Sequence, residues 1–287
     1  MNLTEEIRRK AREWLESKVT DCVIGYERAT DGVTARPLFA YGVEEADRLI
    51  FDQTCHHNLA RYVLNRKGKV TAIVVKPCDS RAINLLLNEN QIQRDNVLII
   101  GVVCPGIVET GWRRVGEKLQ NACQMCQQHT PVLYDFLVGG PPAPEPMVPD
   151  PYLDVAEMEG RSAAERRAFW EWQFSRCIRC YACRQVCPGC YCAECFVDRL
   201  DPLWVGIRIA PGENEMWNTG RAFHLAARCI GCYQCEQVCP VHIPLSLLNR
   251  KLEKETRQTF RFQAGMSAEA PPPFSTFQKE ERLGIGE

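Results

Sequence analysis

Two stretches of the chain carry cysteines at a spacing that can hold a cubane iron–sulfur cluster. The first stretch begins at Cys177 and the second at Cys229, and both read C-x₂-C-x₂-C-x₃-C-P. Every cysteine of the second stretch follows its counterpart by 52 positions (229 − 177 and 239 − 187). This spacing is the bacterial-ferredoxin signature of a [4Fe–4S] cluster. Two signatures at one fixed offset predict two clusters.

The shape of a cubane predicts which cysteines share a cluster. A tight loop with a cysteine at every third position can supply three corners, but it turns away before reaching the fourth. The fourth ligand is therefore expected from the other stretch. The predicted sets are Cys177, Cys180, Cys183 and Cys239 for cluster 1, and Cys229, Cys232, Cys235 and Cys187 for cluster 2. Pro188 and Pro240, which fix φ and lack an N–H, turn the chain after each distal ligand.

Disulfides and zinc fit these stretches less well than iron–sulfur clusters do. Residues 1–12 read as a charged amphipathic helix without the apolar segment of a signal peptide. Paired zinc sites use two C-x₂-C knuckles separated by longer gaps. Seventeen cysteines without an export signal therefore predict metal ligation in a reducing cytoplasm. Oxygen-labile clusters further indicate an anaerobic host.

Composition narrows the function classes. At 287 residues the chain has the length of about two domains. The net charge of −1 disfavours a nucleic-acid partner, because it provides no broad attraction to phosphate. No uninterrupted apolar run has the length of a membrane span.

Residues 1–138 read as an α/β domain with parallel strands. Residues 69–76 and 96–103 are nearly continuous apolar strands, as buried parallel strands are. The helix between them is expected to be capped by Asp79 or Ser80 and to end at Asn88, which implies a right-handed crossover. The other expected elements are strands at 22–26, 35–41 and 48–51, helices at 3–18, 58–66 and 110–119, and an apolar run at 130–138.

A proline-dense linker at 139–151 marks the predicted domain boundary. Residues 152–255 are expected to form an α+β domain like bacterial ferredoxin, with an insertion at 196–219 that could face a partner. Its expected helices are 162–175 and one that begins at Pro244, with Leu245, Leu248 and Leu252 on one face. Residues 256–287 are expected to form an extended tail, which either wraps a partner or is disordered.

The α/β domain carries candidates for a third metal site. Cys78 and Cys104 each follow one of the two buried strands, and parallel strands deliver their carboxyl ends to one edge of the sheet. Cys123 and Cys126 add a C-x₂-C pair, and Cys55 is a spare candidate. Spacing alone leaves two readings open. Either four thiols enclose another [4Fe–4S] cluster, or Cys78 and Cys104 are buried apolar residues and the pair binds zinc or nothing.

Resemblance to known families favours the third cluster. Lys76-Pro-Cys-Asp-Ser-Arg-Ala-Ile, the strand that ends in Cys-Pro-Gly, and C-x₂-C-x₄-P-x₃-D-x₃-G from Cys123 resemble the beta subunits of deazaflavin-reducing hydrogenases and formate dehydrogenases. In that family, matching cysteines hold a [4Fe–4S] cluster beside a flavin. The motifs at 186–192 and 221–229 are similar to iron–sulfur subunits of anaerobic sulfite reductase and sulfhydrogenase, and to subunits that accompany heterodisulfide reductases.

The resemblance implies a subunit of a soluble complex with flavoprotein or heterodisulfide reductase-like partners. It allows FAD binding, but the chain has no G-x-G-x-x-G loop to support it, and we expect no flavin. Three further thiols follow only the first stretch, and they are Cys190, Cys192 and Cys195. They could tune the neighbouring cluster, replace one of its ligands or be passive, and we expect them to be passive or to tune the cluster.

The sequence shows no convincing nucleophile, acid–base pair or substrate pocket. The predicted function is therefore electron transfer between a flavin- or hydride-handling partner and a terminal reductase. Two alternatives remain: a catalytic subunit that itself binds flavin or deazaflavin, and a structural or regulatory iron–sulfur protein.

Overall fold

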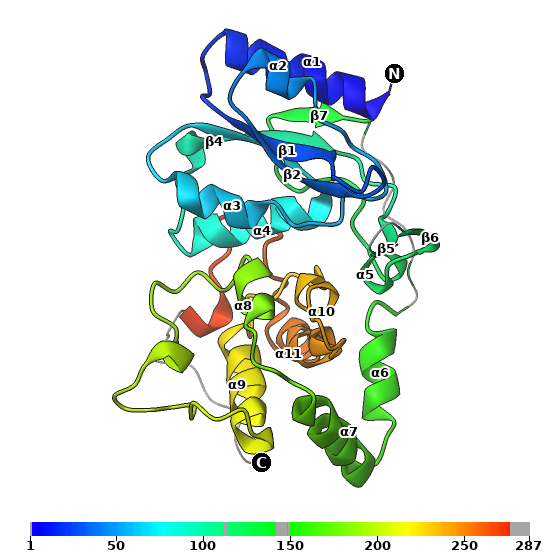
Figure 1. Cartoon of the computed structure of the whole chain (residues 1–287), viewed down its shortest axis with the longest axis vertical. Helices are drawn as coiled ribbons and strands as arrows, with labels where there is room; N and C mark the ends of the chain where they lie inside the picture. Colours follow the sequence, from blue (N-terminus) through cyan, green and yellow to red (C-terminus); the bar gives the residue numbers. More distant parts are fainter. Residues whose placement is uncertain (1, 112–113, 142–147, 149, 276–287) are drawn as a thin grey trace.

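The computed structural model describes residues 2–111, 114–141, 148 and 150–275. An α/β half and a helical half that contains both cysteine stretches pack on each other (Figure 1). In the described part of the chain, no helix combines the length and the apolar character needed to cross a bilayer. The proline-dense segment lies largely outside the described residues.

The α/β half is built on a mostly parallel sheet, as predicted. Its strands are β1 (Val23–Arg28), β2 (Ala35–Ala40), β3 (Thr71–Val75), β4 (Val97–Val102) and β7 (Phe136–Val138), in the order β2-β1-β3-β4-β7. Only β1 and β2 pair antiparallel; β1–β3, β3–β4 and β4–β7 are parallel. Every residue of β3 is buried, which explains its continuous apolar sequence.

Helices cover both faces of this sheet. α1 (Leu3–Glu16) and the short α2 (Val43–Ala46) lie on one face, whereas α3 (Ala60–Val63) and α4 (Pro77–Asn88) lie on the face toward the helical half (Figure 1). α1 buries an apolar stripe formed by Ile7, Ala11, Trp14 and Leu15. α4 therefore lies between the sheet and the cysteine stretches.

Three local predictions in this half were wrong. Residues 110–111 and 114–119 lie in strands, β5 (Val108–Gly111) and β6 (Arg114–Leu119), because the β-branched Thr110 and Val115 favour extended backbone over helix. Residues 48–51 contribute one isolated bridge, from Ile50 to Tyr26, because the preceding residues form α2 and its turn. α4 begins at Pro77, ahead of the predicted caps, and the Asp79 carboxylate accepts a hydrogen bond from the Lys76 N–H at 2.9 Å.

The helical half consists of helices packed around the cysteine loops. In chain order these are α6 (Leu153–Glu159), α7 (Ala163–Ser175), α8 (Ala182–Val186), α9 (Pro211–His224), α10 (Gln234–Gln237) and α11 (Leu245–Phe260), whereas the short α5 (Asn121–Gln124) follows β6 in the α/β half. Short 3₁₀ turns cover Leu64–Arg66, Arg94–Asn96, Phe196–Asp198 and Pro273–Ser275. α11 continues past the predicted domain end at 255.

The segment after α11 returns to the α/β half. The Arg81 guanidinium donates to the Ala264 carbonyl at 2.9 Å, and the Asn84 amide donates to the Gly265 carbonyl at 3.0 Å. The start of the expected tail therefore lies against α4 of the same chain. Residues 276–287 fall outside the described residues.

Candidate metal centres

The two cysteine stretches fold into the same loop. Arg179 and Tyr181 have φ of 49° and 58°, and their counterparts Gly231 and Tyr233 have φ of 68° and 56°. Positive φ is costly for residues with a side chain, so its repetition at both positions marks a loop that the geometry requires. A short helix follows each loop, α8 after the first and α10 after the second.

The arginine at the first of these positions is held by its own side chain. The Arg179 guanidinium donates hydrogen bonds to the carbonyls of Gly206, Ile207 and Arg208, at 2.5, 2.6 and 2.6 Å. These bonds offset the backbone strain, and they attach the insertion to the first cysteine loop. In the second stretch the same position is Gly231, which has no side chain and adopts positive φ without such bonds.

The structure brings the predicted ligands of cluster 1 together across the two stretches. The pKa of the Cys183 thiol is raised to about 11, mainly by burial and in smaller part by the neighbouring Cys177, Cys180 and Cys239. The Asn214 side chain from α9 donates to the Cys177 carbonyl at 2.8 Å and fixes the start of the loop. The backbone N–H of Ile243 points at the Cys239 sulfur at 3.4 Å.

The predicted ligands of cluster 2 line one narrow cavity of about 20 Å³, and they are Cys187, Cys229, Cys232 and Cys235. Cys187 reaches this cavity from the first stretch. Burial raises the pKa of Cys232 and of Cys235, and Cys187 is within electrostatic range of both thiols. The Gly231 N–H approaches the Cys229 sulfur at 3.5 Å. Cys187 therefore lies beside the three leading cysteines of the second stretch, and ligation across the stretches stays a prediction.

The four predicted ligands of cluster 3 line a second cavity of about 120 Å³, and they are Cys78, Cys104, Cys123 and Cys126. Cys78 lies in the first turn of α4, and Cys104 lies just beyond β4, at the expected edge of the sheet. Backbone N–H groups approach two of the sulfurs, Ile107 to Cys123 at 3.3 Å and Gln128 to Cys126 at 3.4 Å.

These sites have the donor chemistry of iron–sulfur ligation. Burial raises the pKa of Cys104 and of Cys235 to about 12, so these thiols stay protonated unless a cation lies among them. Hydrogen bonds from backbone N–H groups to the sulfurs are one of the factors that set the reduction potential of such clusters. Within the described residues, no three or more histidine, cysteine or acidic side chains are grouped as ligands of one metal ion. A cubane is a wider site, because iron and sulfide separate its thiolates.

The three cysteine groups form a continuous series. Cys232 of the second set is within electrostatic range of Cys78 in the third set. Cys235 of the second set is likewise within range of Cys183 in the first. The second group therefore lies between the other two.

One buried glutamine that the sequence did not reveal contributes to the junction between the halves. Gln234, in α10, accepts a hydrogen bond from the Asn58 backbone N–H at 3.2 Å and donates to the His56 carbonyl at 2.8 Å. An ion pair between Arg228 and Glu89 at 2.7 Å supports the same junction. Gln234 directly precedes Cys235 in the sequence, and no pattern there indicates that its side chain joins the two halves.

The remaining cysteines lie apart from these sets or beside them. Cys55 is fully buried, and the groups that act most strongly on its ionisation include no other cysteine. Cys190 contacts the Cys187 thiol, and a hydrogen bond between the two thiols lowers the pKa of Cys187. A separate cavity is lined by all three extra thiols, Cys190, Cys192 and Cys195.

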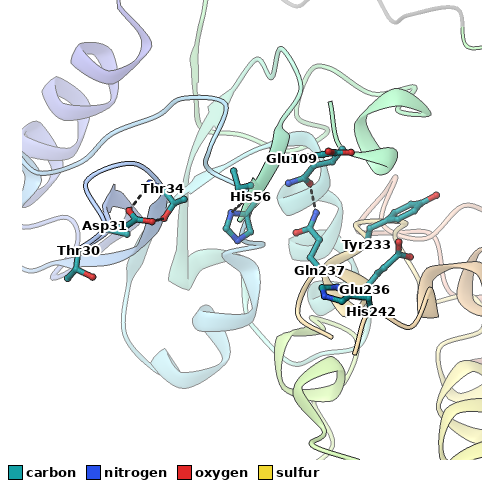
Figure 2. Close-up of a pocket in the computed structure, with 12 residues that line it drawn as sticks. Thr30, Asp31, Thr34, His56, Glu109, Tyr233, Glu236, Gln237 and His242 are labelled. Atoms are coloured by element: carbon teal, nitrogen blue, oxygen red, sulfur yellow. Dashed lines mark hydrogen bonds between the residues drawn. The ribbon is translucent and has the colours of Figure 1, made fainter. Parts of the chain in front are cut away.

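A larger open pocket of about 550 Å³ lies where the halves meet (Figure 2). Its walls come from the β1–β2 turn, from His56 and Glu109, and from the second cysteine stretch. Asp31, Glu109 and Glu236 all line it, so its lining is acidic. Asp31 accepts hydrogen bonds from the N–H groups of Val33 and Thr34, both at 2.9 Å. Burial raises the pKa of Glu236 and also lowers that of His56.

Comparison with known proteins agrees with the iron–sulfur character of the chain. A family model described as a 4Fe-4S binding domain matches residues 225–244, which contain the second stretch. The chain is 25% identical to the F420-dependent formate dehydrogenase subunit beta of Methanocaldococcus jannaschii, over 91% of each protein. It is 24% identical to the F420-dependent formate dehydrogenase 1 subunit beta of Methanococcus maripaludis, over 90% of this chain and 89% of the relative.

The resemblance to formate dehydrogenase beta subunits is confirmed, and it extends well beyond residues 69–138. The resemblance of the C-terminal half to subunits of sulfite reductase, sulfhydrogenase and heterodisulfide reductase complexes stays a prediction. The chain carries a 4Fe-4S binding domain near its C-terminus and is homologous to beta subunits of F420-dependent formate dehydrogenases.

Proposed function

We propose that this chain is an electron-transfer subunit of a cytoplasmic redox complex. It relays single electrons between a partner that handles flavin or hydride chemistry and a terminal reductase, such as a heterodisulfide reductase-like subunit. The observation that carries the proposal is the series of three four-cysteine groups. A [4Fe–4S] cluster supplies one-electron exchange, and neighbouring groups in the series come within electrostatic range through Cys78, Cys232, Cys235 and Cys183.

In this proposal each predicted domain holds its own clusters. Residues 1–138 would hold the third cluster, and residues 152–255 would hold the other two in crossed ligand sets. The sheet supports this assignment, because β3 and β4 are parallel and bring Cys78 and Cys104 to one edge. The duplicated loops support it in the second half, because Cys187 of the first stretch lines the same cavity as Cys229, Cys232 and Cys235.

The insertion between the stretches is the proposed contact with a partner subunit. Ile207 is 80% exposed, and Leu200, Trp204 and Ile209 also expose most of their apolar surface. Arg179 holds this segment against the cluster 1 loop. An apolar contact there would therefore bring the partner's own redox centre next to the first cysteine group.

A second candidate is a catalytic subunit that binds flavin or deazaflavin. The open pocket favours it, since about 550 Å³ is in the range of cofactor sites, and the relatives are named F420-dependent. Its acidic lining, from Asp31, Glu109 and Glu236, would repel the phosphates of such cofactors. We therefore favour the electron-transfer role.

Anaerobic purification with partners retained tests the proposal, followed by measurement of iron, sulfide and flavin. We expect about twelve irons per chain and reduction by dithionite that gives magnetically interacting EPR signals. Iron-free protein with zinc in the loops would refute the proposal. About one flavin per isolated chain would favour the second candidate, and clusters inert to dithionite would favour a structural role.

A further inference from the structure

Arg221 is a buried cation without an acidic partner in the described part of the chain. It belongs to the buried face of α9 and is 4% exposed. Its guanidinium donates to the Cys183 carbonyl at 3.0 Å, while its Nε, also buried, has no hydrogen-bond partner. Arg179 is also buried without an acidic partner, but its guanidinium donates to three carbonyls. Other buried basic side chains have acidic partners. Lys76 pairs with Asp79 at 2.8 Å, and Arg250 pairs with Asp154 at 3.1 Å.

Cysteines surround this charge. Besides its bond to the Cys183 carbonyl, Arg221 lines the narrow cavity that Cys187 and Cys235 also line. It lines a second cavity together with Cys190. Cys183 belongs to the cluster 1 set, whereas Cys187 and Cys235 belong to the cluster 2 set. A guanidinium stays charged in a protein, so its burial is costly unless negative charge lies nearby. Among the described residues Arg221 makes no ion pair, and predicted ligands of both clusters lie beside it.

We propose that Arg221 is a positive charge shared by two iron–sulfur sites, and that it raises the reduction potential of both. The inference rests on the proposed function, because it concerns the same two clusters. Adding an electron makes a thiolate-ligated cluster more negative, and a fixed nearby cation stabilises that more negative state. Arg221 is not itself a ligand. Its charge acts on the clusters through their cysteine ligands.

The experiment is an anaerobic redox titration, followed by EPR, of the full chain with its clusters. In R221M, we expect the reduction equilibrium of both sites to shift about tenfold toward the oxidised form, or 59 mV more negative per tenfold for a one-electron couple. R221K keeps the charge, so its reduction equilibrium is expected to stay within about threefold of that of the wild type. N218A is the matched control, because Asn218 is buried one turn earlier on α9 and carries no charge.

Unchanged potentials in R221M would overturn the inference. An equal shift in R221K and R221M would also overturn it, because shape rather than charge would then matter. Should R221M fail to retain iron, the iron content of R221K decides: full iron supports charge compensation, and loss in both variants refutes it.

The test separates this inference from the proposed function. Wild-type protein that lacks iron would refute the proposed function before any variant is compared. Iron-loaded R221M with wild-type potentials would refute only the role of Arg221.

Discussion

Replacing Cys104 by alanine is expected to remove the third cluster and leave the other two. Cys104 is 8% exposed and lies at the end of β4, with Cys123 and Cys126 within electrostatic range. Three thiolates do not close a four-ligand cubane, so the iron content should fall from about twelve to about eight per chain. The visible absorbance of the clusters should fall by about one third, because each cubane contributes similarly.

Cys22 offers a matched control for this change. It is fully buried beside β1, and the groups that act on its ionisation are Arg66, Asp21, Tyr41 and Glu45 rather than cysteines. Both C22A and C104A remove one buried thiol of the same size, and only C104A removes a predicted ligand. Only C104A should lose iron.

Iron and sulfide assays on anaerobically purified protein decide the outcome. About twelve irons in C104A would refute the assignment of this ligand. If C55A then fell to about eight, Cys55 would take the place of Cys104 in the third site. About eight irons in the wild type would refute the third cluster itself.

Three further predictions concern the junction, the partner surface and the metal. Gln234→Ala leaves the Asn58 N–H and the His56 carbonyl unpaired, so unfolding of the iron-loaded protein in urea should become easier by about 3 kcal/mol; an unchanged midpoint would contradict this. Ile207→Glu should keep full iron but weaken co-purification of partner subunits. The same substitution at Leu153, an exposed apolar residue on α6, should leave co-purification unchanged. Equal loss of partner subunits in both variants would argue against the insertion as the contact. Removing iron with a chelator should lower the calorimetric melting temperature, because buried Arg221 loses its compensating charge; an apoprotein as stable as the loaded form would contradict it.

The sequence predicted the parts of this protein that depend on short-range patterns. The apolar runs at 69–76 and 96–103 predicted parallel β3 and β4, because strands buried on both faces need apolar residues throughout. The fixed offset of 52 residues predicted two equivalent loops, and the structure repeats their left-handed positions at 179 and 231. Ligation by these cysteines stays a prediction.

What the sequence did not predict depends on contacts between distant segments. The predicted apolar face of α11 is an example, since Leu245 is buried but Leu248 and Leu252 are only half-buried. The buried face instead includes Asn249, Arg250 and Glu253, because α11 packs beside the cysteine loops and not on an apolar core. Periodicity identifies a helix, but it does not identify what the helix faces.

The packing of the two halves brings the second and third cysteine groups close together. Cys78 lies in the first turn of α4 and Cys232 lies in the second cysteine loop, so neither half alone brings them within range. Gln234 stands two residues from Cys232 and holds the α/β half by two buried hydrogen bonds. It is not itself a predicted ligand, so Gln234→Ala should retain about twelve irons while the two halves separate more easily. Magnetic coupling between the third and second clusters should then weaken in EPR, and full coupling in that variant would show that other contacts hold the halves together.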